Sequence, residues 1–344
     1  MSSVDVVVPC YNYAKYLRQC AQSILSQRDT SVRVLIIDDA SPDNTPEVAG
    51  QLAALDRRVT YVRNETNLGL IGTANKGVME WASADYVLLL SADDALTPGS
   101  LARSTGLLDA NPGMGLAYGM ALMLHDEGPE LLVDDVDGTA SRVIPGHEFL
   151  QRICANGNFV ATSTAVMRTS VQHRIGGYNP KFRHTSDLDM WMRAAVAGPV
   201  GFVDAVQGFY RWHQANMSAA YYHRPADDRL EVIATCTDFM EKHRNDIPQF
   251  GSWFEELRTS FGSDLLLRAT KAFESDDDPT WRNSLEVAQR LWPDYWRSPI
   301  WWKFVAKRIL GQRSTRLLQG FRDRKSPGEW SDHGNVVGRW SSTK

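Results

Sequence analysis

The stretch DYVLLLSADD, residues 85–94, carries an uninterrupted apolar segment directly into two adjacent aspartates, Asp93 and Asp94. A second segment of the same form, VRVLIIDD at residues 32–39, also ends in an Asp-Asp pair. Apolar runs of this kind are typical of strands that are buried on both faces of a parallel sheet. The two segments therefore predict buried strands whose carboxyl ends carry paired acids.

Strand-like and helix-like segments alternate around these two over the first hundred residues. Short β-branched runs predict further strands at 4–9 and 59–64. Apolar residues at helical spacing predict helices over 13–27 and 46–55 and in a segment that ends at Trp81. This alternation predicts an α/β fold with a mostly parallel, doubly wound sheet.

Both acidic pairs fall where open α/β sheets bind their ligands, beyond the carboxyl ends of the strands. The four carboxylates expected to converge on one rim are Asp38, Asp39, Asp93 and Asp94. A cation would offset their repulsion, and a hard divalent ion such as Mg²⁺ or Mn²⁺ suits oxygen ligands. The alternative for any single aspartate is an N-cap or an Asx-turn residue.

The composition excludes several classes of protein. The chain has 344 residues, 43% of them hydrophobic and 23% charged, and a formal net charge of -4, so no nucleic-acid partner is expected. The four cysteines are widely spaced without a zinc-binding pattern, and we expect reduced thiols and a cytoplasmic protein. No apolar run approaches the length of a membrane span, and the first residues lack the pattern of a secretory signal.

Two segments after residue 175 hold further candidate residues. In GGYNPKFRHTSDLDMWMR, residues 176–193, Asp187 lies near the start of a predicted helix, where the helix dipole stabilises a carboxylate. A simple helix cap is the alternative for this aspartate. In YRWHQANMS, residues 210–218, Arg211 and His213 suit a phosphate contact or a metal ligand.

Six segments, in this order along residues 4–218, resemble glycosyltransferase family 2, inverting sugar transferases of the GT-A fold that use nucleotide-activated donors. They are VVVPCYNYAKYLRQCAQSILSQ, VLIIDDASPDNT, NLGLIGTANKGV, LLLSADDALTPGSL, GGYNPKFRHTSDLDMWMR and YRWHQANMS. The resemblance implies a GT-A type, Rossmann-like nucleotide-binding core with a mainly helical C-terminal region.

The resemblance also implies roles for individual residues. Asp187 matches the general base, Asp94 and His213 match metal ligands, and Gly176, Gly177 and Tyr178 match a loop near the acceptor. The positions that match the nucleotide-sugar site are Pro9, Tyr11, Asn12, Asp39, Asn67, Gly69, Asn75, Asp93 and Arg211.

Two positions depart from the pattern of the family. Ser91 stands where many relatives have an aspartate of the metal-binding region, and Ser186 stands where a glutamate commonly precedes the base. Asp189 is the alternative base.

These features predict a glycosyltransferase that depends on a divalent cation, Mg²⁺ or Mn²⁺, and moves a sugar with inversion to an acceptor hydroxyl. A UDP-sugar is the expected donor, with dTDP and GDP as alternatives, and the acceptor is a glycan, a cell-envelope polysaccharide, a glycolipid or a small molecule. Two other functions stay open: a catalytically inactive nucleotide-sugar-binding or scaffold protein, and a sugar-nucleotide pyrophosphorylase. The motifs of P-loop kinases and serine hydrolases are absent from the sequence.

The expected domains are a catalytic domain over 1–220, a helical region over 221–325 and a flexible tail over 326–344. Within the helical region, residues 296–325 hold nine Lys or Arg and one Asp, interleaved with aromatic and aliphatic side chains. Such a segment suits peripheral contact with the inner face of an anionic membrane. An amphipathic helix that packs on the catalytic domain is the alternative.

Overall fold

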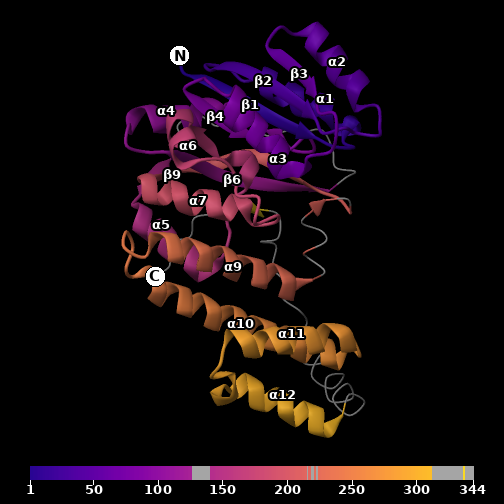
Figure 1. The fold of residues 1–344 in the computed structure, drawn as a ribbon, viewed down its shortest axis with the longest axis vertical. Coiled ribbons are helices and arrows are strands. Elements are labelled where there is room, and N and C mark those ends of the chain that lie inside the picture. The colour runs from indigo at the N-terminus through magenta and orange to yellow at the C-terminus, as the bar shows by residue number, and fades with distance from the viewer. Residues whose placement is uncertain (126–139, 215, 218–220, 222–223, 312–335, 338–344) are drawn as a thin grey trace. The chain divides into compact units, whose positions relative to one another are not determined.

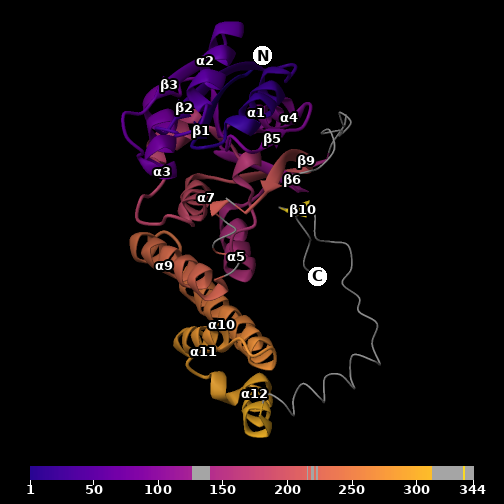
Figure 2. The same cartoon turned by 90° about the vertical axis from the view of Figure 1, so that its right-hand side faces the viewer.

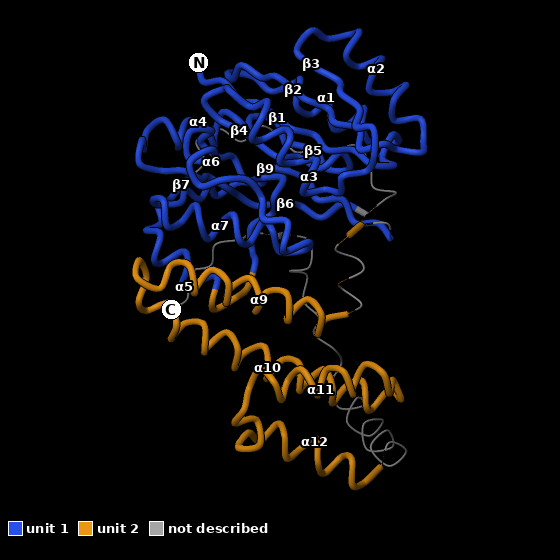
Figure 3. The backbone as a smooth tube through the Cα atoms, viewed as in Figure 1, with its two compact units in different colours: residues 1–153, 158–214, 335–344 blue, residues 154–157, 215–334 orange. Residues whose placement is uncertain are grey.

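The computed structural model describes residues 1–125, 140–214, 216–217, 221, 224–311 and 336–337. The chain divides into two compact units (Figure 3). Unit 1 comprises residues 1–153, 158–214 and 335–344, and unit 2 comprises residues 154–157 and 215–334. The basic residues beyond 311 and most of the predicted tail lie outside the described residues.

Four parallel strands form the first half of the sheet in unit 1 (Figure 1). Their order is β3-β2-β1-β4, with bounds Ser3–Cys10 for β1, Ser31–Asp38 for β2, Val59–Arg63 for β3 and Tyr86–Leu89 for β4. All four strands lie where the apolar segments predict them. Since β1 and β2 pair in register from Ser3 with Ser31 to Cys10 with Asp38, both strands end at the same rim.

The second half of the sheet is mixed, and it continues from β4 in the order β8-β6-β9-β5. Strand β8 pairs antiparallel with β4 and with β6, whereas β6 and β9 pair in parallel. Two short strands complete the sheet, β7 against β9 and β10 against β6. The bounds are Ala95–Leu96 for β5, Leu116–His125 for β6, Ser141–Ile144 for β7, Val166–Arg168 for β8, Val200–Trp212 for β9 and Val336–Val337 for β10.

The helices of unit 1 follow the strands. They are α1 (Ala14–Leu25), α2 (Thr45–Leu55), α3 (Gly69–Asn75), α4 (Ser100–Ala110), α5 (Gly146–Asn156), α6 (Thr169–Ile175) and α7 (Ser186–Ala197), and the last residues of α5 fall in unit 2. Helix α3 continues as a π-helical segment, η1 (Lys76–Trp81), and a 3₁₀ turn, η2, spans Thr162–Thr164. These elements confirm the predicted α/β class.

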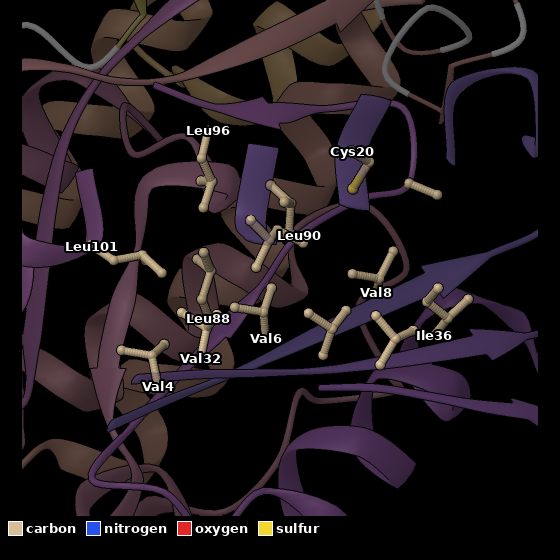
Figure 4. Close-up of a cluster of buried hydrophobic side chains, with 14 of the residues drawn as sticks. Val4, Val6, Val8, Cys20, Val32, Ile36, Leu88, Leu90, Leu96 and Leu101 are labelled. Carbon is tan, nitrogen blue, oxygen red and sulfur yellow. The ribbon is translucent and has the colours of Figure 1, made fainter. Parts of the chain in front are cut away.

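The core of unit 1 is an apolar cluster contributed by β1, β2, β4 and the helices that follow them. Figure 4 shows the side chains of Val4, Val6 and Val8 on β1 next to Leu88 and Leu90. All five are at most 1% exposed. The core therefore fixes the strands whose ends carry the acidic pairs.

Unit 2 is helical, as the sequence predicts. Its helices are α9 (Pro225–His243), α10 (Phe250–Glu274), α11 (Asp278–Leu291) and α12 (Pro299–Leu310), with a 3₁₀ turn, η3, at Tyr295–Arg297. Helix α10 contacts α9, α11 and α12 (Figure 2). The rings of Phe273, Trp281 and Phe304 meet at centroid distances of 5.7–6.0 Å and form an aromatic core. Within the described residues, none of the helices combines the length and apolar character that a membrane crossing needs.

Candidate active site

Two tight turns shape the rim at the ends of β1 and β2. Asn12 and Ala40 adopt left-handed backbone conformations, with φ of 61° and 59°. The backbone N–H of Asn12 donates to the Ser41 hydroxyl at 3.1 Å, and the N–H of Ser41 donates to Asp38 at 2.8 Å. A left-handed backbone in a non-glycine residue is rare, so both loops are held in one conformation by contacts between them.

Asp38 and Asp39 are buried but have different partners. Asp38 forms an ion pair with Arg63, at the end of β3. Asp39 accepts hydrogen bonds from the Asn64 side chain and from the N–H of Leu68, both at 2.8 Å through Oδ1. The charge of Asp38 is therefore neutralised by the Arg63 guanidinium, whereas Asp39 holds the loop between β3 and α3 through hydrogen bonds.

Asn64 is a site residue that the sequence analysis did not identify. It is buried, and its amide nitrogen contacts Asp39 and Thr73 while its oxygen accepts from Lys76 at 2.8 Å. Its position at the end of a predicted strand was the only signal in the sequence, because its partners are brought together by the fold.

Other residues assigned to the nucleotide side lie at the end of β1 or close to the start of α3. Pro9 pairs with Ile37 within β1 and β2, and Tyr11 is 47% exposed at the end of β1. Asn67 accepts from the N–H of Gly69 at 2.8 Å, and Gly69 has φ of 74°, which favours glycine. The assignment of these residues to a nucleotide stays a prediction.

The second acidic pair meets the end of β9. Asp94 accepts from the backbone N–H of Arg211 at 2.9 Å, and the Arg211 guanidinium donates to the carbonyl of Asp93 at 2.9 Å. His213 Nε2 lies 3.1 Å from Asp93 Oδ2, and the Ser91 hydroxyl donates to the other oxygen of Asp93. The fold thus joins residues about 120 positions apart that the sequence analysis placed in one site.

Two aromatic side chains at the start of α1 pack against this cluster. The His213 ring stacks on Tyr16 at 5.4 Å and meets Tyr13 edge-on at 5.3 Å. The Arg211 guanidinium lies 4.7 Å from the centre of the Tyr16 ring and donates to Gln19. The two tyrosines were not assigned a role in the site from the sequence.

The electrostatics of this cluster favour a bound cation. Burial and the neighbouring charge of Asp93 raise the pKa of Asp94 well above its usual range. A divalent ion would offset the repulsion between the carboxylates, whose oxygens are suitable ligands for Mg²⁺ or Mn²⁺. Within the described ranges, however, no three His, Cys, Asp or Glu side chains are grouped closely enough to hold a metal. The four carboxylates at the ends of β2 and β4 therefore do not form the single metal-binding group that was expected, because Asp38 and Asp39 bind protein partners instead.

Asp187 lies in the first turn of α7, as predicted. Its Oδ2 accepts from Asn158 Nδ2 at 2.8 Å and from the Thr162 hydroxyl at 3.4 Å, and its Oδ1 accepts from the N–H of Leu188. Burial raises the pKa of Asp187, and the Leu188 N–H and Asn158 partly offset this effect. Asn158 and Thr162 follow α5 in the chain, and the sequence analysis did not identify them.

Asp189 has a different environment from Asp187. It is 3% exposed and pairs with Arg193 at 2.8 Å. Arg193 in turn donates to the carbonyls of Ile175 and Gly177. Asp189 therefore holds Arg193 in place against the loop at 175–177. This ion pair disfavours Asp189 as the alternative base.

Comparisons with known proteins identify the class of protein to which the chain belongs. A family model described as glycosyl transferase family 2 matches residues 5–119. The putative glycosyltransferase EpsE of Bacillus subtilis is 28% identical over 203 residues, which cover 58% of this chain and 69% of that protein. An uncharacterized glycosyltransferase of Nostoc is 26% identical over 223 residues, which cover 63% and 67%.

Solved structures show the same fold. The crystal structure of S. aureus TarS 1-349 in complex with UDP-GlcNAc has a TM-score of 0.62 and 18% identity, and the match covers 92% of both chains. The mannosyltransferase PcManGT from Pyrobaculum calidifontis, in complex with GDP-Man and Mn²⁺, has a TM-score of 0.53 and 14% identity, covering 92% of this chain and 84% of that one.

These findings confirm the predicted class. The chain is a glycosyltransferase with the GT-A type of α/β fold, and its residues 5–119 carry the family 2 region.

Proposed function

We propose that this enzyme transfers a sugar from a nucleotide-sugar donor to an acceptor hydroxyl, with inversion and with dependence on a divalent cation. The observation that supports this proposal most is the cluster of Asp93, Asp94, Arg211 and His213, which puts two carboxylates, a guanidinium and an imidazole at the end of β9.

Asp94 and His213 would hold the cation, with Asp93 directed toward the ribose of the donor. When bound, the cation would neutralise part of the negative charge of the diphosphate. Arg211 would stabilise the same charge as it grows on the departing nucleoside diphosphate. Its buried guanidinium, which lies over Tyr16, is suited to this role because a charge acts more strongly away from water.

Asp187 would act as the general base. As the acceptor oxygen attacks the anomeric carbon, its proton passes to Asp187 and a new carbon–oxygen bond forms. The bond from the anomeric carbon to the phosphate oxygen breaks on the opposite face, and its electron pair remains with the nucleoside diphosphate. The raised pKa of Asp187 makes it a better proton acceptor than an exposed carboxylate.

On the nucleotide side, Pro9, Tyr11, Asn12, Asn67 and Gly69 would line the pocket, and Asp39 would accept a hydrogen bond from the base or ribose. UDP is the proposed nucleotide. TarS is described with UDP-GlcNAc and PcManGT with GDP-Man, so both donor types belong in the test.

The test is a thermal-shift titration with UDP, dTDP and GDP, each with and without Mn²⁺, followed by an assay of nucleoside diphosphate release from the matching sugar donors. A ligand at a hundred times its dissociation constant stabilises the native state by about 2.7 kcal/mol, which gives a visible shift. A shift that requires Mn²⁺, followed by turnover, supports the proposal. Binding without release or transfer from any donor favours the scaffold protein, and consumption of UTP with a sugar 1-phosphate favours the pyrophosphorylase.

We further propose that α12 contacts an anionic membrane, which would suit a lipid-linked acceptor. Trp302, Ile309 and Leu310 are 60%, 81% and 54% exposed, and with Ala306 they recur at helical spacing opposite the buried Phe304. The exposed Lys303 and the basic sequence that follows would supply the attraction to anionic lipid. Sedimentation with phosphatidylglycerol vesicles compares the full chain with a Trp302→Glu/Ile309→Glu variant. Equal recovery of both proteins in the supernatant would contradict this role.

A further inference from the structure

Asn75, the last residue of α3, is bound to the backbone of Tyr178, about a hundred residues away. Its Nδ2 donates to the carbonyl of Tyr178 at 2.8 Å, and its Oδ1 accepts from the N–H of the same residue at 2.7 Å. Both polar atoms of the side chain are therefore used by one backbone unit. The resemblance to the family placed Asn75 at the nucleotide site, whereas the structure gives its side chain a different partner.

The contact leaves no space for a larger residue next to it. A Cβ atom at Gly177 would lie 2.4 Å from Asn75 Oδ1 and 2.8 Å from its amide carbon. The φ of Gly177 is outside the left-handed region, since only Gly176 in this pair has a positive value, 88°. Glycine at 177 is thus required by the side chain of Asn75, not by the backbone conformation.

The same loop is fixed to α7 from its other side. Arg193, on α7, donates to the carbonyls of Ile175 and Gly177 and is held by Asp189. Helix α7 carries Asp187 in its first turn. Tyr178 is buried, and its burial and the charge of Asp187 both raise its pKa.

Helix α3 is also tied to the nucleotide side of the site, both near Asn75 and directly before its first residue. Thr73, two residues before Asn75, accepts from Asn64, which also donates to Asp39. Asp39 holds the N–H of Leu68, directly before α3. The helix then widens into the π-helical η1, where Gly77 packs so closely on Val7 of β1 that a Cβ would meet it at 2.2 Å. Such π-helical turns occur often at functional sites.

We infer that Asn75 is a positioning residue that fixes the 175–178 loop, and through it the proposed base Asp187, relative to the nucleotide-binding side of the site. The inference rests on the proposed function. It assigns Asn75 to the alignment of the base with the donor and not to the binding of the nucleotide.

The first test separates binding from turnover in Asn75→Ala. Calorimetry with UDP, GDP and dTDP in Mn²⁺ gives the dissociation constant, and release of diphosphate from UDP-GlcNAc and GDP-mannose gives kcat. We expect a dissociation constant within about twofold of wild type and a kcat lower by about 10²-fold, the effect of a displacement near 1 Å. The acidic limb of the kcat profile should also move, because the environment of Asp187 changes. A dissociation constant raised by about tenfold with unchanged kcat would overturn the inference and make Asn75 a nucleotide ligand.

The second test is a double-mutant cycle between Asn75 and Gly177. Gly177→Ala should lower kcat as Asn75→Ala does, since the new methyl group displaces the Asn75 amide. In the double variant the smaller side chain at 75 leaves room for that methyl group, so the two effects should not add. Gly106→Ala in α4, where nothing lies within 4 Å of the new Cβ, is the matched control and should keep wild-type kcat. Additive losses would overturn the proposed coupling.

The outcomes also distinguish this inference from the proposed function. A wild-type chain that releases no diphosphate from any donor contradicts the proposed function and this inference with it. A wild-type chain that turns over while Asn75→Ala matches its kcat and pH profile contradicts the inference alone. Should Asn75→Ala fail to fold, Asn75→Asp, which retains the acceptor for the Tyr178 N–H, and Gly177→Ala carry the same comparison.

Discussion

Asp94 and Asp187 are both carboxylates with raised pKa values, but different surroundings cause the two shifts. Asp94 is buried beside a second carboxylate, so its pKa rises from burial and from the repulsion of Asp93. The pKa of Asp187 is raised by burial alone, and hydrogen bonds from Leu188 and Asn158 partly offset the rise. A cation would relieve the first arrangement and not the second. The comparison therefore fits the proposed roles, a metal ligand for Asp94 and a proton acceptor for Asp187.

The largest effect is expected from Asp187→Asn. The amide keeps the shape and an acceptor for the Leu188 N–H, but it cannot take a proton, so kcat should fall by about 10²- to 10⁴-fold. Calorimetry should find an unchanged dissociation constant for the donor nucleotide. Turnover at the wild-type rate would remove Asp187 from the mechanism.

Asp94→Asn should act on the metal instead. The neutral amide still accepts from the Arg211 N–H but is a weaker metal ligand, so the metal-dependent part of nucleotide affinity should fall by at least about tenfold. Titrating Mn²⁺ at fixed nucleotide, with EDTA-treated protein as the metal-free reference, measures this loss. Identical Mn²⁺ dependence in variant and wild type would count against the assignment.

Asn158→Ala tests the effect of a hydrogen bond on the pKa of Asp187. Because the Asn158 amide lowers the pKa of Asp187, its removal should raise that pKa further. The base acts only when it is deprotonated, so kcat falls as the pH drops through this pKa, and the acidic limb should move to higher pH in the variant. Activity at pH 8 should change little. An acidic limb that stays in place would show that Asp187 does not control it.

The smallest effect is on stability in the absence of metal. A carboxylate whose pKa is raised on folding favours the folded state below its unfolded pKa, and this stability is lost as the pH rises toward the folded value. Asp94→Asn should therefore raise the Tm of metal-free protein at neutral pH, by about 2–4 °C for each kcal/mol gained.

Asp5→Asn is the control for this measurement. The Asp5 carboxylate is buried and accepts hydrogen bonds from Arg33 and from the N–H groups of Ser83 and Ala84. The neutral amide weakens these hydrogen bonds, so the Tm should fall. An Asp94→Asn variant that loses stability as Asp5→Asn does would contradict the proposed origin of the raised pKa.

The sequence predicted the parallel half of the sheet because β1 to β4 are local apolar runs with polar ends, and their positions agree closely with the structure. It did not predict the mixed half, since β6, β8 and β9 pair across long separations in the chain. The same limit applies to the site. The motifs assigned Asp93 and Arg211 to the same site. No motif indicated the partners of Asn64, Asn75 and Asn158, because the fold brings those partners close from distant parts of the chain.

The most direct measurement is nucleotide affinity with and without Mn²⁺ in three proteins: wild type, Asp94→Asn and Asp187→Asn. Calorimetry with UDP, GDP and dTDP should show that one nucleotide binds wild type tightly only with Mn²⁺. Asp187→Asn should keep this dependence and Asp94→Asn should lose it. Equal affinity with and without Mn²⁺ in wild type, or the same loss of Mn²⁺ dependence in both variants, would contradict the proposed roles of Asp94 as metal ligand and Asp187 as base.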